Sequence, residues 1–293
     1  MEPTPRLFCF GLGYTAERLA AALGREGWRL AGTCREQARQ TALAAQGIES
    51  FLFDRGRPLF DPAVALAGTT HLLSSVPPDG DGEAVLDMHG EAIAAAAPHL
   101  VWAGYLSTTG VYGNLDGEWV DESSPLRPSG ARGERRVAAE ARWLALGRER
   151  GLPIHVFRLA GIYGPGRNYF EALRAGKARR VVKPGQVFSR IHVDDIVAVL
   201  RASMARPNPG AVYNVADDEP AAPDQVILHA ARLLDLPAPP ALPFEDAQLS
   251  EMARSFYADS KRVRNERIKR ELGVRLSFPN YRVGLAALLT AGG

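Results

Sequence analysis

Apolar and polar positions alternate in blocks through the first 160 residues: each short apolar run is followed by a stretch in which apolar residues recur every three or four positions. Such runs are typical of buried strands, and the recurring pattern is typical of helices that cover a sheet. Repeated strand and helix units predict an α/β protein with a parallel, doubly wound sheet. We expect strands at 7–12, 28–34, 50–53, 70–76, 100–108 and 154–164, and helices that include 83–97 and 133–150.

The pattern changes after residue 165. A Gly-rich, basic stretch is followed by a helix at 194–205 that Asp194 and Asp195 are expected to cap, a strand within 211–216, a Pro-rich segment at 237–243 and a helical tail. We therefore expect a sheet domain over 1–165, to which 191–215 returns, and a smaller C-terminal subdomain over 166–293 that resembles a lid.

The segment GLGYTA at 11–16 comes directly after the first expected strand. In such a segment Gly11 permits the tight turn, Gly13 lets the backbone approach a phosphate, and Ala16 permits close helix packing. The first NH groups of the next helix favour a pyrophosphate. The sequence therefore predicts a Rossmann-type dinucleotide site, and Tyr14 and Thr15 lie in the same turn.

The end of the second expected strand carries no acid. A protein selective for NAD usually places an acid there to bind the ribose hydroxyls, whereas this chain has Arg35, with Arg39 one helical turn later. An arginine suits a 2′-phosphate, so NADP is favoured over NAD. The alternative is that both arginines are solvated and that Glu36 takes the role of the acid.

Three more polar residues close strands on the same side of the expected sheet. Asp54 follows the third strand, where an acid can meet the adenine amino group, although a cap or turn explains it as well. Ser74 and Ser75 close the fourth strand. We expect all three to line the cofactor site.

Composition limits the classes of partner. The chain has 293 residues, 46% of them apolar, which is enough for a sizeable core. Its net charge of +2 indicates neither a nucleic acid nor an anionic membrane as partner. With only two cysteines and no signal peptide pattern, a reducing, cytoplasmic location is expected. No group of residues has metal-ligand spacing.

Four motifs in order give the chain a resemblance over nearly its whole length to the extended short-chain dehydrogenase/reductase family, of the NAD-dependent epimerase/dehydratase type. The motifs are GLGYTA, STTGVYG at 107–113, RLAGIYGPGR at 158–167 and IHVDDIV at 191–197. The resemblance implies a Rossmann-type fold with a small substrate-side subdomain, a nicotinamide cofactor and redox or epimerase chemistry.

The resemblance also implies catalytic positions, and at one of them this chain has different residues from the family. Thr108 stands where the family polarises the substrate oxygen, but the family's YxxxK pair aligns with Arg132 and Arg136. An arginine stays charged and is a poor general acid, so Arg132 is not expected to replace the tyrosine. Arg136 is expected to hold the ribose or a phosphate of the cofactor. Tyr163 is the nearest alternative proton donor by family position, followed by Tyr112 and His192. A relay through water is the other route.

Two positions that often contact a nucleotide sugar in the family are Gly161 and Phe188 here. A nucleotide sugar is therefore not the expected substrate. The basic residues near the cleft, with Lys183 of the run at 177–183, favour a different, anionic small molecule, and the alternative is that this run is a solvated loop. The resemblance places Arg167, Asn168 and Arg190 at the mouth of its cleft.

Two function classes remain open at this point. The first is an NADP-dependent oxidoreductase or epimerase-like enzyme with a non-standard active site. The second is a catalytically inactive NADP-binding redox sensor or regulatory protein, since the fold alone does not decide activity. A scaffold that forms a homodimer through the helices at 83–97 and 133–150 is a third, weaker interpretation, because both helices also have the apolar faces needed to cover a sheet.

Overall fold

The computed structural model describes residues 4–292, apart from the side chains of Met252 and Ser255, and the chain folds into two compact units. Unit 1 runs to Thr108 and includes 134–158 and 197–213. Unit 2 contains 109–133, 159–196 and the chain from 214 onward. The domain boundary expected at residue 165 stays a prediction.

The described part of the chain contains one large, seven-stranded sheet. In sheet order its strands are β11 (Val212–Val215), β7 (Ile154–Leu159), β5 (Trp102–Thr108), β4 (His71–Ser74), β1 (Arg6–Phe10), β2 (Arg29–Cys34) and β3 (Glu49–Leu52). The chain moves outward from β1 to β3, returns to β4 beside β1, and moves outward again on the other side. The strand pairs from β5 to β3 are parallel, which confirms the Rossmann-type, doubly wound α/β fold.

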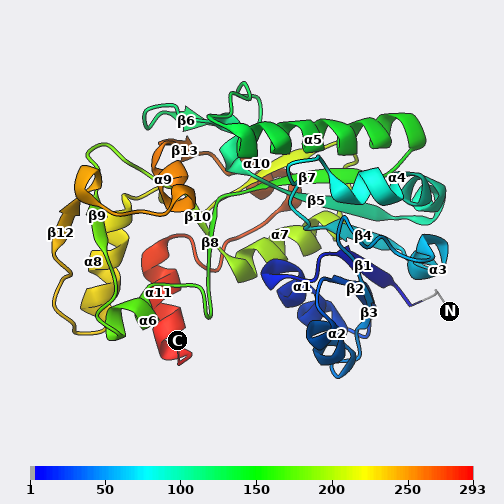
Figure 1. Ribbon diagram of the computed structural model, residues 1–293, viewed down its shortest axis with the longest axis horizontal. Helices are drawn as coiled ribbons and strands as arrows, with labels where there is room; N and C mark the ends of the chain where they lie inside the picture. The colour runs from blue at the N-terminus through cyan, green and yellow to red at the C-terminus, as the bar shows by residue number, and fades with distance from the viewer. Residues whose placement is uncertain (1–3, 293) are drawn as a thin grey trace. The chain divides into compact units, whose positions relative to one another are not determined.

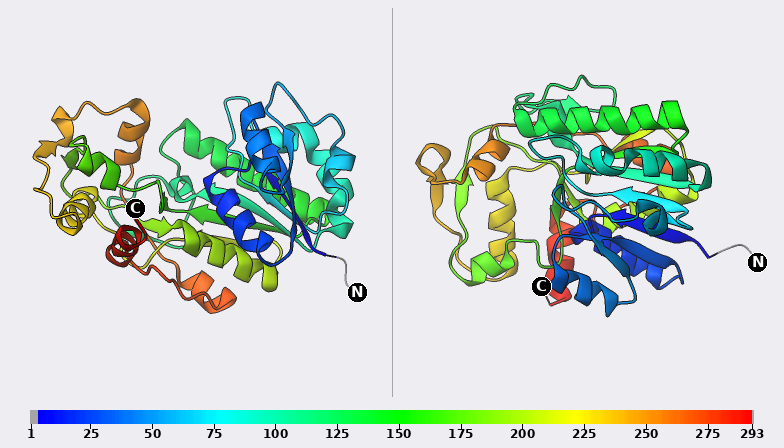
Figure 2. Two further views of the ribbon diagram at one scale, coloured as in Figure 1. Left: turned by 90° about the horizontal axis from the view of Figure 1, so that it is seen from below. Right: turned by 45° about the vertical axis from the view of Figure 1, so that its right-hand side comes forward.

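Helices cover both faces of this sheet (Figures 1 and 2). They are α1 (Tyr14–Gly24), α2 (Gln37–Ala44), α3 (Pro62–Leu66), α4 (Ala84–Ala96), the 3-10 helix η1 (Ala97–His99), α5 (Ala131–Arg150) and α7 (Val193–Ala205). On one face α4 and α5 lie side by side, joined by a 2.6 Å ion pair between Asp87 and Arg142. On the other face Arg201 of α7 pairs with Glu26, just after α1.

The apolar runs seen in the sequence are the buried strands. Every residue of β1, β4 and β7 is buried, and between the sheet and its helices Phe8, Phe10, Tyr105 and Trp143 form part of one apolar core. Cys9 and Cys34 lie in the neighbouring strands β1 and β2, and both are buried free thiols.

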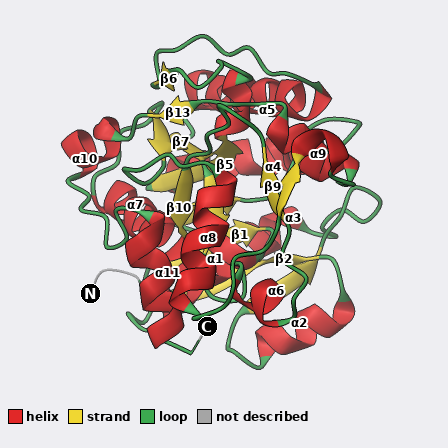
Figure 3. Ribbon diagram, turned by 90° about the vertical axis from the view of Figure 1, so that its left-hand side faces the viewer, coloured by secondary structure: helices red, strands yellow, loops and turns green. Residues whose placement is uncertain are grey.

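Unit 2 contains shorter elements. They are η2 (Thr109–Tyr112), β6 (Trp119–Val120), β8 (Gly161–Tyr163), α6 (Phe170–Arg174), β9 (Arg180–Val182), β10 (Arg190–His192), α8 (Pro223–Leu233), β12 (Ala241–Pro243), η3 (Phe244–Asp246), α9 (Glu251–Tyr257), β13 (Arg262–Val263), α10 (Glu266–Leu272) and α11 (Tyr281–Thr290). The strands pair as β8 with β10, β9 with β12, and β6 with β13. Helices α8 and α11 lie side by side (Figure 3) and share an apolar core with Phe170, Ile227 and Leu285.

Three sequence expectations need correction. The expected strand at 154–164 is two strands, β7 and β8, and α8 was not anticipated at all. Asp195 does not cap α7, which begins at Val193. Its buried carboxylate instead accepts hydrogen bonds from the backbone NH groups of Ser277 and Phe278, at 2.8 and 3.0 Å, and so fixes the segment that leads into α11.

No helix within residues 4–292 combines the length and the apolar character that crossing a bilayer requires.

A buried ion pair joins β7 to α5. Arg158 Nη2 lies 2.8 Å from Glu140 Oε2, and the two side chains are 6% and 3% exposed. Glu140 also accepts a 2.5 Å hydrogen bond from Ser107 Oγ at the end of β5. One carboxylate thus ties together two strands and a helix.

Replacing one partner of a buried ion pair leaves the other charge uncompensated, at a cost of about 3–5 kcal/mol. We expect Arg158→Met to lower the free energy of unfolding by an amount of this order, measured by urea denaturation. Arg148→Met, on the exposed side of α5, is the matched control and should change it by less than about 0.5 kcal/mol. Equal losses of unfolding free energy in Arg158→Met and Arg148→Met would contradict a stabilising role of the ion pair.

Candidate functional site

The turn after β1 is held by two hydroxyl groups from neighbouring parts of the sheet. The NH of Gly11 donates to Thr33 Oγ1 at 2.8 Å, and Ser75 Oγ donates to the carbonyl of Gly11 at 2.5 Å. Gly11 has φ +83°, a conformation that favours glycine. A Cβ there would also lie 3.0 Å from both Ser75 Oγ and the Val76 side chain. The turn therefore requires glycine for two independent reasons.

Gly13 is the residue that precedes α1, and the space around it is open. A Cβ built on Gly13 would meet no atom within 4 Å. No side chain caps the first turn of α1, whose first acidic residue is Glu17. In the same turn Thr15 and Ala16 are buried and Tyr14 is half-buried. An open glycine at an uncapped helix N-terminus has the form of a pyrophosphate site.

The two arginines expected to select NADP differ in their surroundings. Arg35 follows β2 directly and is exposed, and within the described residues its guanidinium has no hydrogen bond or ion pair. Arg39 forms an ion pair with Glu17 of α1. Of these two arginines, Arg35 is therefore the one whose charge is available to a ligand.

The remaining cofactor candidates lie at the ends of β3 and β4. Asp54 pairs with Arg57 at 3.0 Å, within a local turn. Ser75 is used in the Gly11 turn. Ser74 is fully buried, and its hydroxyl has no hydrogen bond partner among the described residues. Of these three, Ser75 positions the backbone of the site.

Thr108 is the last residue of β5 and is half-buried. Its neighbour Ser107 is fixed by Glu140, as described above. Arg132 and Arg136, which the resemblance is expected to align with the family's YxxxK pair, lie four residues apart on α5. Arg136 donates to the carbonyl of Leu106 at 2.6 Å, and Arg132 is exposed, 5.5 Å from the centroid of the Phe256 ring.

Glu83 is a buried ionisable residue that the sequence did not single out. It precedes α4, is 1% exposed, and neither carboxyl oxygen has a hydrogen bond partner in the described chain. Burial raises its pKa to about 7, and the positive charges of Arg136 and Arg142 oppose this rise. No sequence motif surrounds Glu83, so its burial can be recognised only in the folded structure.

Tyr163 lies in the core of unit 2 and is 8% exposed. Its hydroxyl donates to the carbonyl of Asn280 at 3.4 Å, and its ring packs edge-on against His192 and over Gly284. Burial, followed by the nearby Asp217 and Asp195, raises its pKa. Its role as a proton donor stays a prediction, and these surroundings give the hydroxyl a structural role.

The other two candidate proton donors, Tyr112 and His192, also lie inside unit 2. The hydroxyl of Tyr112 donates to Asn214 Oδ1 at 2.7 Å, and His192, which is 1% exposed, accepts from the NH of Asp194 at 3.2 Å. After Tyr112, the carbonyl of Gly113 accepts a 2.7 Å hydrogen bond from the buried Lys261. Lys261, which sequence reasoning missed, therefore fixes the end of the STTGVYG turn.

The three substrate candidates are placed differently from one another. Arg190 is 7% exposed and donates to the carbonyls of Phe188 and Ala221, at 3.0 and 2.9 Å. Asn168 bonds to the carbonyl of Gly164 and to the NH of Phe170 at the start of α6. Arg167 is exposed. Since Arg190 and Asn168 hold the backbone, Arg167 is the member of the set that is open to solvent.

Comparison with known proteins gives one family and several relatives. Residues 89–216 match the model of the NAD dependent epimerase/dehydratase family. A structure of a conserved protein of unknown function from Silicibacter pomeroyi DSS is 56% identical, with a TM-score of 0.91, over 98% of this chain and 99% of that one.

A 3-diazoavenalumate denitrifying reductase from a Streptomyces species is 33% identical over 57% of this chain and 58% of its own. The dTDP-glucose 4,6-dehydratase from Bacillus anthracis str. Ames, in complex with NAD, has a TM-score of 0.75 at 15% identity, over 98% of this chain and 96% of that one. At this identity the likeness establishes the shared fold.

The buried carboxyl of Glu83 makes a pH-dependent prediction. Because its pKa is raised from 4.5 to about 7, the folded state keeps the proton while the unfolded state loses it, so stability falls as the pH rises from about 4.5 to 7. Each pH unit in this window costs up to about 1.4 kcal/mol. Glu83→Gln should remove this dependence, and its melting temperature should exceed that of the wild type by more at pH 8 than at pH 5.

Glu149→Gln, at an exposed position of α5, is the control and should leave the pH dependence unchanged. Parallel pH profiles of the wild type and Glu83→Gln would contradict a protonated Glu83.

Proposed function

We propose that this chain, whose residues 89–216 match the model of the NAD dependent epimerase/dehydratase family, is an NADP(H)-dependent oxidoreductase or epimerase-like enzyme acting on a small, anionic molecule. The observation that carries the proposal is the Gly11 turn, which Thr33 and Ser75 fix ahead of the uncapped N-terminus of α1.

We assign the binding of the pyrophosphate to the backbone from Gly11 to Ala16. Open space over Gly13 admits a phosphate, and the N-terminus of α1 offers NH groups and a partial positive charge. Ser75 and Thr33 act indirectly, by holding Gly11. Asp54, just after β3, is a further proposed contact of the cofactor, whereas Ser74 is fully buried and is assigned none.

Arg35 is the proposed determinant of NADP over NAD. Its guanidinium is exposed at the end of β2 and is not neutralised by a described residue, whereas Arg39 already pairs with Glu17. A planar guanidinium matches a phosphate with two parallel hydrogen bonds. The 2′-phosphate of NADP is the group that would meet it.

Bound NADP supplies a hydride acceptor or, when reduced, a hydride donor. We propose that the hydroxyl of Thr108 donates a hydrogen bond to the substrate oxygen on which charge develops. Arg136 holds the β5 backbone through Leu106 and supports the cofactor with its charge. Because the Tyr163 hydroxyl is buried and bonded to Asn280, we favour a proton relay through water over direct donation by Tyr163.

The alternative is a protein that binds NADP without turnover. It shares the cofactor site, so cofactor binding does not distinguish the two functions. The discriminating measurement is hydride transfer, which the enzyme performs and the sensor does not.

The NADP assignment predicts the effect of Arg35→Asp. A hydrogen bond to a charged group contributes about 1.5–3 kcal/mol, so the substitution should weaken NADPH binding roughly 10- to 100-fold and leave NADH binding nearly unchanged. Tryptophan fluorescence titration with both cofactors measures this. Arg25→Asp, an exposed arginine after α1, is the control, and equal losses for NADPH and NADH in Arg35→Asp would contradict the assignment.

The proposed role of Thr108 predicts a loss of turnover. We expect Thr108→Ala to lower kcat by about 100-fold or more, since removal of one oxyanion donor costs this much, and Thr108→Ser to retain most of the rate. The assay follows NADPH oxidation with a panel of small anionic carbonyl compounds. A full rate in Thr108→Ala would exclude this residue from the reaction, and a wild type without turnover on any compound would favour the sensor.

A further inference from the structure

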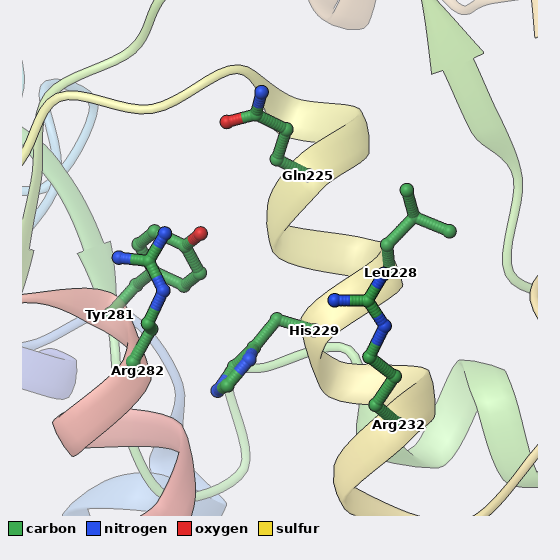
Figure 4. Close-up of a pocket in the computed structure, with 6 residues that line it drawn as sticks. All are labelled: Gln225, Leu228, His229, Arg232, Tyr281 and Arg282. Atoms are coloured by element: carbon green, nitrogen blue, oxygen red, sulfur yellow. The ribbon is translucent and has the colours of Figure 1, made fainter.

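A hollow lies between two helices of unit 2, apart from every residue assigned above. It has a volume of about 290 Å³ and is lined by Gln225, Leu228, His229 and Arg232 of α8 and by Tyr281 and Arg282 at the start of α11 (Figure 4). This volume is at the lower end of the range of small-molecule sites. The α8 residues are spaced three and four apart, so they share one face of the helix.

The lining is cationic and contains no carboxylate. Arg232 is exposed, and in the described part of the chain its guanidinium makes no hydrogen bond or ion pair. Arg282 is also exposed, but its position is fixed. Its Nη1 pairs with both oxygens of Glu219, and the guanidinium stacks 4.6 Å from the centroid of the Tyr281 ring. The other nitrogens of Arg282 remain as donors.

His229 adds a neutral polar group between the two arginines. Burial, followed by the positive charge of Arg282, lowers its pKa. Its Nε2 atom is buried without a hydrogen bond partner among the described residues, and its ring is held edge-on to Tyr281 at 5.6 Å. As Figure 4 shows, the ring points from α8 toward α11. A ring nitrogen to which the described residues offer no partner is suited to a bound polar group.

The N-terminus of α11 does not explain these features. Asn280 already caps it, because its side chain accepts from the NH groups of Arg282 and Val283. Recognition in the hollow therefore depends on side chains. Two guanidinium groups, one of which has no counter-ion, together with an amide and an imidazole, match an oxyanion with several acceptor oxygens.

We propose that the hollow between α8 and α11 is a binding site for a small phosphate-bearing molecule, whose phosphate is held by Arg232, Arg282 and His229. The hollow is larger than one phosphate group requires, and Leu228 and the Tyr281 ring provide apolar surface for a short carbon chain. The site is independent of the proposed redox activity, because it shares no residue with the proposed cofactor or substrate contacts.

The test is isothermal titration calorimetry of the full chain with inorganic phosphate and with methyl phosphate at pH 7.5. We expect saturable binding of both, weakened at least tenfold by Arg232→Gln and by Arg282→Gln. Arg148→Gln, which removes one exposed positive charge on α5, should change the affinity by less than twofold. Both lining arginines are exposed, so neither substitution should unfold the chain, and melting temperatures check this.

Several outcomes overturn the proposal. The proposed site is wrong if the wild type shows no saturable binding of phosphate. It is also wrong if both lining variants keep the wild-type affinity, which is the result expected if phosphate binds only at the α1 turn. A loss of the same size in Arg148→Gln would show that net charge alone governs binding. Tighter binding of succinate than of either phosphate, with the same dependence on Arg232, would contradict the phosphate class.

Discussion

The proposed cofactor site depends on the two hydrogen bonds that hold Gly11. Thr33 comes from β2 and Ser75 from the end of β4, so the strands on either side of β1 together fix the point at which the chain leaves the sheet. The positive φ of Gly11 then directs the chain into α1. A backbone hydrogen bond from the NH of Leu12 to the carbonyl of Thr33, at 2.8 Å, adds to this support, so the chain that leads to Gly13 is fixed relative to the end of β2, where Arg35 lies.

Most of the fold could be predicted from the sequence because its strands are short, mainly apolar runs that alternate with helical patterns. The error at 154–164 has a physical cause. The NH of Ala160 bonds to the carbonyl of Val215, next to β7, whereas the NH of Gly161 bonds to Ser189, so the chain changes its strand partner between two adjacent residues. An apolar run carries no sign of such a change. Helix α8 was missed although Pro223 in its first turn is a known start signal.

In the candidate site, too, the features set by neighbouring residues could be predicted, and those set by distant segments could not. The glycine turn could be predicted because its chemistry lies within six consecutive residues. The surroundings of Tyr163 could not, since they depend on Gly284, more than a hundred residues away, which leaves room for the tyrosine ring. Glu83 and Lys261 carry no motif either. Their burial follows from packing against segments that are distant in sequence.

The central claim, an NADP site at the Gly11 turn, is tested most directly by a crystal structure of the chain grown with NADP. The account predicts the pyrophosphate at the N-terminus of α1, against the backbone of Gly11 to Ala16, and the 2′-phosphate within hydrogen-bonding distance, about 3 Å, of the Arg35 guanidinium. A structure with the cofactor bound elsewhere, or with the 2′-phosphate directed away from Arg35, would contradict it.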